Sequence, residues 1–90
     1  FRRANRVTVD SKDQARLEAG DFVAALREGV LNWSDVPDFG QVMIGRYSGR
    51  NHASDVTVFK SLGLGIQDVA TGVRVLELAR KAGIGTELPI

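Results

Sequence analysis

Ser61 is the side chain best placed for binding chemistry, because it begins a turn in which Gly63 and Gly65 link a short apolar strand to a long helix. The glycines let a ligand approach the backbone closely, and the free N–H groups at a helix start attract anionic or polar ligand atoms. The Ser61 hydroxyl could reach a ligand amide, although capping its own helix is the simpler role. A dinucleotide fingerprint needs a third glycine at a set spacing, so the turn alone predicts only a tight strand-to-helix connection.

Four other side chains carry reactive groups without the surroundings that catalysis or metal binding needs. Arg46 and Arg50 could grip a carboxylate or a phosphate, but arginines in a polar loop are more often solvated. Nothing in the sequence supplies Lys60 with the desolvated pocket of a nucleophilic amine. His52 has no carboxylate or cysteine at ligand spacing, which indicates a surface histidine.

Acidic residues gather near the start of the first predicted helix, where negative charge interacts favourably with the helix dipole. This position accounts for Asp10, Asp13, Glu18 and Asp21 without catalysis. No acid–base pair is visible, and we predict no catalytic residue in this chain.

The residues that precede the turn predict a strand followed by short helices. Val7–Asp10 alternates like a strand, but it has no hairpin partner nearby and no obvious sheet to join. Asp10 or Ser11 can cap a helix that begins at Lys12. Gly20 is expected to interrupt this helix, and a second helical segment is expected from Asp21 to Leu26.

A further short helix is predicted to begin at Ser34 or Asp35 and to end at Gly45, with Pro37 in its first turn. Residues 46–55 are polar and glycine-containing, which predicts a surface loop.

The last third of the chain predicts strand, helix and strand. Val56–Phe59 is β-branched and aromatic, and Ile66–Ala82 has a wide apolar face that requires neighbours on two sides. Gly83 is expected to end this helix, and Thr86–Ile90 alternates like a last strand.

The composition bounds the class of protein. The chain has 90 residues, 43% of them hydrophobic and 26% charged, which fits at most one small domain. A formal net charge of +1 is too balanced for a nucleic-acid partner. The absence of cysteine excludes disulfides, and no apolar run reaches membrane-spanning length, so we expect a cytoplasmic protein with no membrane partner.

Residues 56–70 (VTVFKSLGLGIQDVA) and 83–90 (GIGTELPI) resemble the C-terminal part of the ornithine cyclodeaminase and mu-crystallin family. The resemblance continues upstream through residues 7–11 (VTVDS), 14–15 (QA) and 18–21 (EAGD). Proteins of this family are dimeric, with a Rossmann nucleotide domain inserted into a substrate-binding and dimerisation domain.

The resemblance implies an α/β fold that forms the C-terminal part of a two-domain protein, so the chain is expected to be a fragment. Residues 1–55 would end the Rossmann-type nucleotide-binding domain. Residues 56–90, a strand, a long helix and a terminal strand, would return to the substrate-binding and dimerisation domain. Both unpaired strands and the apolar helix would then find partners in the homodimeric intact protein.

The same resemblance assigns two site residues. The serine that matches Ser61 contacts the cofactor, NAD or NADP, near its nicotinamide, and the residue that matches Leu62 lines the substrate pocket. The family's glycine-rich nucleotide loop, its substrate-gripping arginine and lysine and its acidic proton donor lie upstream of this chain. The isolated chain is therefore expected to be inactive.

The function implied is that of an NAD(P)-dependent enzyme acting on amino acids or cyclic imines. Ornithine cyclodeamination, ketimine reduction and alanine dehydrogenase-like chemistry stay open, as does a non-enzymatic nucleotide-binding protein similar to mu-crystallin. A free-standing interaction module is a further alternative, and it predicts a cooperative monomeric fold.

Overall fold

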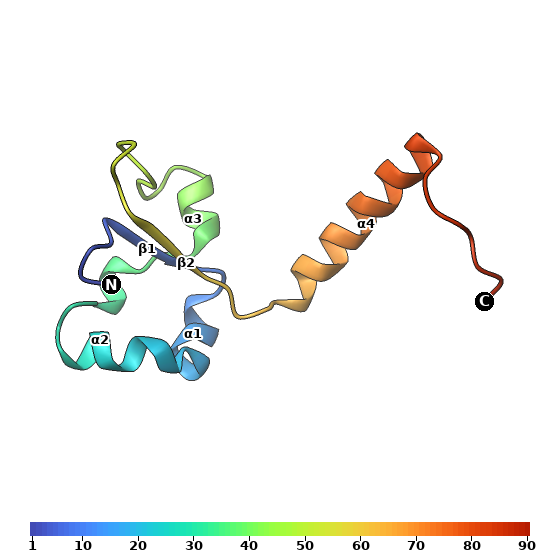
Figure 1. Ribbon diagram of the computed structural model, residues 1–90. Coiled ribbons are helices and arrows are strands. Elements are labelled where there is room, and N and C mark those ends of the chain that lie inside the picture. Colours follow the sequence, from blue (N-terminus) through green and yellow to red (C-terminus); the bar gives the residue numbers. More distant parts are fainter.

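Two parallel strands form the centre of the fold in the computed structural model, which describes residues 1–90 (Figure 1). Strand β1 (Arg6–Val9) pairs with β2 (Thr57–Lys60), in a register that runs from Arg6 opposite Thr57 to Val9 opposite Lys60. The predicted strand is confirmed, but the expectation that its partner lay outside the chain is wrong. The partner follows far downstream, as parallel strands require a long crossover connection.

Helix α1 (Lys12–Glu18) begins where the sequence predicts. Ser11 has extended backbone angles, and its hydroxyl accepts a hydrogen bond from the N–H of Gln14 at 3.3 Å, so Ser11 is the N-cap. The predicted interruption at Gly20 is also confirmed. A 3-10 turn (Gly20–Phe22) separates α1 from α2 (Val23–Arg27).

The helix predicted to begin at Ser34 or Asp35 is divided in two. A 3-10 turn (Trp33–Asp35) comes first, and α3 (Phe39–Met43) follows only after an extended break. Pro37 causes the break, because a proline disfavours helical angles in the preceding residue, and Val36 has φ −106° and ψ 92°. The Pro37 carbonyl then accepts a hydrogen bond from the N–H of Val9 at 3.3 Å, so this segment borders the second edge of β1.

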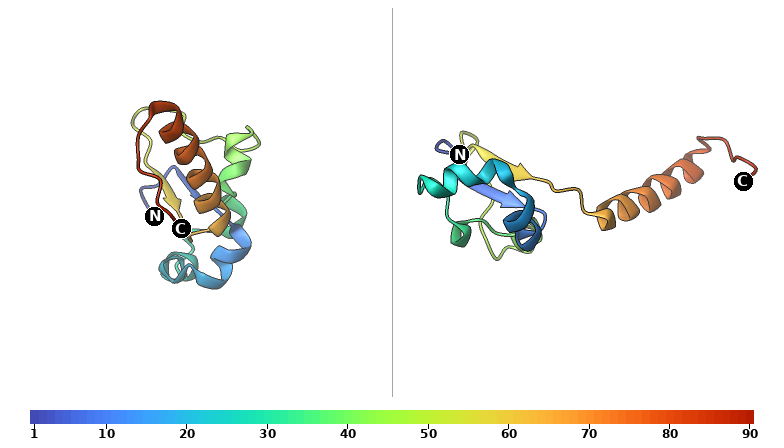
Figure 2. Two further views of the ribbon diagram at one scale, coloured as in Figure 1. Left: turned by 90° about the vertical axis from the view of Figure 1, so that its right-hand side faces the viewer. Right: turned by 90° about the horizontal axis from the view of Figure 1, so that it is seen from below.

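The two faces of the strands are covered differently (Figure 2). Val7 and Val9 point into the core with buried residues of α1, α2 and their connections, among which Phe22 is fully buried. On the other face the Phe59 ring lies 5.2 Å from the Phe39 ring of α3, between ring centroids.

Helix α4 (Gly65–Ala82) projects away from the α/β unit, and none of its residues is buried (Figure 1, Figure 2). The chain therefore extends 55 Å along its longest axis. Gly83 ends the helix in a left-handed conformation with φ 65°, as predicted. The predicted strand Thr86–Ile90 is not formed, because no other strand of this chain lies beside it to supply hydrogen bonds.

Candidate functional site

Asp10 and Ser61 meet at the carboxyl ends of the two parallel strands. Asp10 directly follows β1 and Ser61 directly follows β2, so they extend the register in which Val9 lies opposite Lys60. The N–H of Asp10 also donates to the Lys60 carbonyl at 3.3 Å. In open α/β sheets ligands bind outside the carboxyl ends of the strands. This edge is therefore the candidate site.

The Asp10 carboxylate binds three donors. Oδ2 accepts from the Ser61 hydroxyl at 3.0 Å and from the Leu62 N–H at 2.8 Å, and Oδ1 accepts from the Ser11 N–H at 3.0 Å. Burial raises the pKa of Asp10, but these hydrogen bonds outweigh it and lower the pKa below its ordinary value of 3.8. Asp10 is therefore ionised at neutral pH and can only accept.

Ser61 does not cap the helix that follows it, so its simpler predicted role is wrong. Helix α4 has Leu64 as its N-cap, without a side-chain hydrogen bond. The Ser61 oxygen instead accepts from the N–H of Gly63 at 3.3 Å, while its proton goes to Asp10. The Ser61 side chain stays exposed. Gly63 has φ 79°, a backbone conformation that a residue with a side chain rarely adopts.

Leu62 is half-buried and packs against the hydrophobic core. Its N–H is fixed by Asp10, so the same carboxylate holds both Ser61 and Leu62. Ser61 and Leu62, the two predicted site residues, are thus both hydrogen-bonded to the Asp10 carboxylate. The assignment of Leu62 to a substrate pocket stays a prediction.

Lys60 and Arg50, two of the other side chains considered from the sequence, make local contacts. Lys60 forms an ion pair with Asp21, Nζ to Oδ2 at 3.2 Å. Arg50 donates to the carbonyl of Ala53 and to the hydroxyl of Thr57, each at 3.2 Å. These bonds use the groups that catalysis or anion binding would need.

Asp55 organises the loop that contains His52. Its Oδ2 accepts from the backbone N–H groups of Asn51 at 2.9 Å and His52 at 3.0 Å. These hydrogen bonds lower the pKa of Asp55. The polar loop predicted from the sequence is therefore closed by its own acidic residue.

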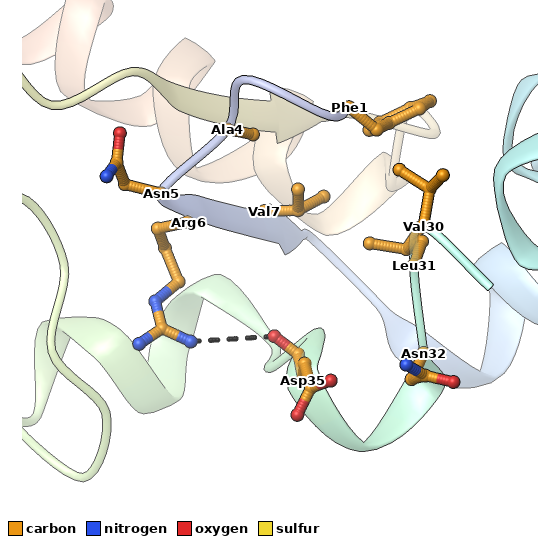
Figure 3. Close-up of a pocket in the computed structure, with 9 residues that line it drawn as sticks. All are labelled: Phe1, Ala4, Asn5, Arg6, Val7, Val30, Leu31, Asn32 and Asp35. Carbon is orange, nitrogen blue, oxygen red and sulfur yellow. Dashed lines mark hydrogen bonds between the residues drawn. The ribbon is translucent and has the colours of Figure 1, made fainter.

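A cavity of about 130 Å³ lies beside the first residues of β1 (Figure 3). Phe1, Val30 and Leu31 form an apolar wall, and the Arg6 guanidinium turns the other way, toward the Asp35 carbonyl, at 3.5 Å. This cavity is at the amino end of the strand, opposite to Asp10 and Ser61. Neither Asp10 nor Ser61 lines this cavity, so it is separate from the candidate site.

For Asp10 the sequence predicts only a role at the start of a helix, as a cap or a partner of the helix dipole, and it misses the hydrogen bonds to Ser61 and Leu62. The sequence signal for the contact between Asp10 and Ser61 is the position of each residue relative to a strand. Asp10 and Ser61 are each the first residue after an apolar strand, and the ends of parallel strands share one edge of a sheet. Recognising the signal required knowing that the two strands pair.

Two parallel strands packed against helices define an α/β fold, and in open α/β sheets the carboxyl ends of the strands are the edge at which ligands bind. Over residues 1–83 the chain matches the ornithine cyclodeaminase/mu-crystallin family, and it belongs to that family. The resemblance stated from residues 56–70 is thereby confirmed.

Two curated relatives and one solved structure illustrate the similarity. The chain is 37% identical over 86 residues to a Δ1-pyrroline-2-carboxylate reductase of Bacillus cereus, covering 94% of this chain and 26% of the relative. It is 34% identical to the alanine dehydrogenase of Archaeoglobus fulgidus, covering 92% and 26%. The solved structure is Thermococcus litoralis Δ1-pyrroline-2-carboxylate reductase in complex with NADH and L-proline. It has a TM-score of 0.69 and 32% identity, with 97% of this chain and 27% of that chain covered.

The chain thus spans about a quarter of the length of the relatives that it matches. The expected nicotinamide dinucleotide agrees with the NADH bound in the Thermococcus reductase. No helix of the chain has the length and apolar character needed to cross a membrane.

Proposed function

We propose that an intact protein containing this chain is an NAD(P)-dependent oxidoreductase that acts on a small amino acid or a cyclic imine. Family membership supports this, as do relatives named as a pyrroline-2-carboxylate reductase and an alanine dehydrogenase. The observation that carries the proposal is the exposed Ser61 hydroxyl, held by Asp10 at the carboxyl ends of β1 and β2.

The residues at this edge fit the nicotinamide end of a dinucleotide. Ser61 is an exposed residue, and apart from Gly63 and its two chain neighbours no heavy atom lies within 4 Å of the position where a Gly63 side chain would begin. A flat ring can therefore approach the backbone there. The dinucleotide supplies or accepts the hydride when bound, Ser61 orients its nicotinamide, and Leu62 shapes the adjacent substrate pocket.

The proposal includes two domains and a homodimer. Residues 1–55 would complete a Rossmann-type nucleotide-binding domain, whose sheet β2 joins through its pairing with β1. The rest of residues 56–90 would return to a substrate-binding and dimerisation domain. Support comes from α4, whose Val69 and Leu76 are 67% and 51% exposed in the chain alone. Apolar side chains in such a continuous row are normally covered by another surface.

An assay of the intact protein tests this function. We expect NADH or NADPH to be oxidised when Δ1-pyrroline-2-carboxylate is added, which a fall in absorbance of the reduced nicotinamide reports. Release of ammonia from ornithine without net cofactor consumption would instead identify a cyclodeaminase. Cofactor binding without hydride exchange with any imine or amino acid would contradict the enzymatic proposal and favour a mu-crystallin-like binder.

A further inference from the structure

The hydrogen bonds around Ser61 leave it one way to meet a ligand. An ionised carboxylate has no proton to donate, so the 3.0 Å contact between Ser61 Oγ and Asp10 Oδ2 uses the only proton of the hydroxyl. The Gly63 N–H occupies one lone pair of the same oxygen at 3.3 Å. A second lone pair is left, and the side chain is exposed. Toward a ligand, Ser61 is therefore an acceptor only.

We infer that Asp10 is a positioning residue that fixes Ser61 as a hydrogen-bond acceptor, so that Ser61 selects the NH₂ group of the nicotinamide carboxamide and not its carbonyl. This inference rests on the proposed function, in which Ser61 contacts the nicotinamide. It adds that Ser61 accepts, and does not donate, the hydrogen bond of that contact, and that Asp10 determines this direction.

The geometry explains why Asp10 can hold this polarity. Its Oδ2 is itself held by the Leu62 N–H at 2.8 Å, and Oδ1 is held by the Ser11 N–H at 3.0 Å. Both oxygens are thus anchored to backbone at the ends of β1 and β2. The Ser61 hydroxyl cannot rotate its proton toward a ligand without giving up a charge-assisted hydrogen bond.

A dinucleotide analogue tests the polarity by binding alone. In the 3-acetylpyridine analogue a methyl group replaces the carboxamide NH₂, while the carbonyl remains. We expect the intact wild-type protein to bind the analogue about tenfold more weakly than the nicotinamide dinucleotide, as measured by calorimetry, because one hydrogen bond is lost. Equal dissociation constants for the two would overturn the inference, since a donating Ser61 would serve both carbonyls alike.

Variants assign the effect to Asp10. In Asp10→Ala the Ser61 hydroxyl is free to donate, and we expect the preference for the carboxamide to fall below about twofold. The exposed Asp13→Ala should keep the full wild-type preference. An unchanged preference in a folded Asp10→Ala protein would overturn the role of Asp10. If that variant does not fold, the analogue comparison in the wild type and in Ser61→Ala still decides the polarity.

Failure of the proposed function gives a different result. If the intact protein bound neither dinucleotide, or if Ser61→Ala bound both as the wild type does, the contact between Ser61 and the cofactor would itself be wrong. If Ser61→Ala weakened both ligands equally, the contact would stand and the acceptor polarity would be refuted.

Discussion

Ser61 donates its hydroxyl proton to Asp10 over 3.0 Å, although the two residues are 51 positions apart in the sequence. The contact follows from the register of the parallel strands, because each residue comes directly after one of the paired residues Val9 and Lys60. The pairing of β1 with β2 therefore builds the candidate site, and a change at Asp10 is expected to affect both stability and ligand binding.

Loss of the Asp10 carboxylate should destabilise the intact protein. Asp10→Ala removes the acceptor of three hydrogen bonds at a partly buried position. We expect the free energy of unfolding to fall by about 1–3 kcal/mol, as urea denaturation would measure. Asp13→Ala on the exposed side of α1 is the matched control and should change it by less than about 0.5 kcal/mol. Equal effects of the two variants would contradict the anchoring role.

The stability conferred by Asp10 should depend on pH. Hydrogen bonds lower its pKa in the folded protein, so between the folded and unfolded values the unfolded chain binds more protons. The stabilisation is present above about pH 4 and is lost as the pH falls through the folded pKa. Urea unfolding from pH 6 to pH 2 should show a shallower pH dependence for Asp10→Asn than for the wild type. Parallel curves would contradict the lowered pKa.

Two glycines of the turn should respond in opposite ways to alanine. Gly63 has φ 79°, so Gly63→Ala introduces strain and should cost about 1–2 kcal/mol of stability. Gly65 is the first residue of α4 and lacks a positive φ, so Gly65→Ala should be neutral or stabilise by up to about 1 kcal/mol. Thermal unfolding of both variants compares them, and destabilisation by Gly65→Ala alone would contradict this backbone geometry.

Leu62 should affect the substrate more than the cofactor. Leu62→Met keeps the volume and the apolar character, so the fold should survive with a loss below about 1.5 kcal/mol. Because the side chain is proposed to shape the substrate pocket, we expect KM for the imine to change by about threefold or more, with an unchanged dissociation constant for the dinucleotide. A changed cofactor affinity at constant KM would show that the assignment is wrong.

The apolar face of α4 should be covered in the intact protein. Leu76→Asp would then place a charge in a packed interface and reduce the free energy of unfolding by at least about 2 kcal/mol. Thr71→Asp, on the polar face of the same helix, is the control and should have little effect. If both variants left the intact protein equally stable, α4 would be solvated there and the proposed return to a second domain would be refuted.

Local patterns predicted most elements of this fold, and long-range pairing accounts for the rest. The Ser11 cap, the break at Gly20, the β2 strand and the end of α4 at Gly83 depend on neighbouring residues, and each was found where the sequence indicated. The pairing of β1 with β2 was missed because a parallel partner leaves no local signal. The strand expected at Thr86–Ile90 is not formed in this chain. An alternating sequence becomes a strand only where a neighbouring strand supplies hydrogen bonds, and this too is a long-range condition.

The site was predicted in part. The glycine-spaced turn indicates Ser61 as a candidate binding residue, and the family resemblance implies that it contacts the cofactor. Its hydroxyl was expected to cap a helix by default, because the acceptor that competes for its proton, Asp10, is distant in sequence. The polarity of Ser61 can be derived only when both strand ends are in place.

The most direct test of the account is the affinity of the intact protein for its nicotinamide dinucleotide in Ser61→Ala and in Ser54→Ala, an exposed serine in the loop before β2. We predict a dissociation constant about tenfold higher for Ser61→Ala and unchanged for Ser54→Ala, measured by calorimetry. Wild-type affinity in a folded Ser61→Ala protein would contradict the claim that this edge of the sheet binds the cofactor through Ser61.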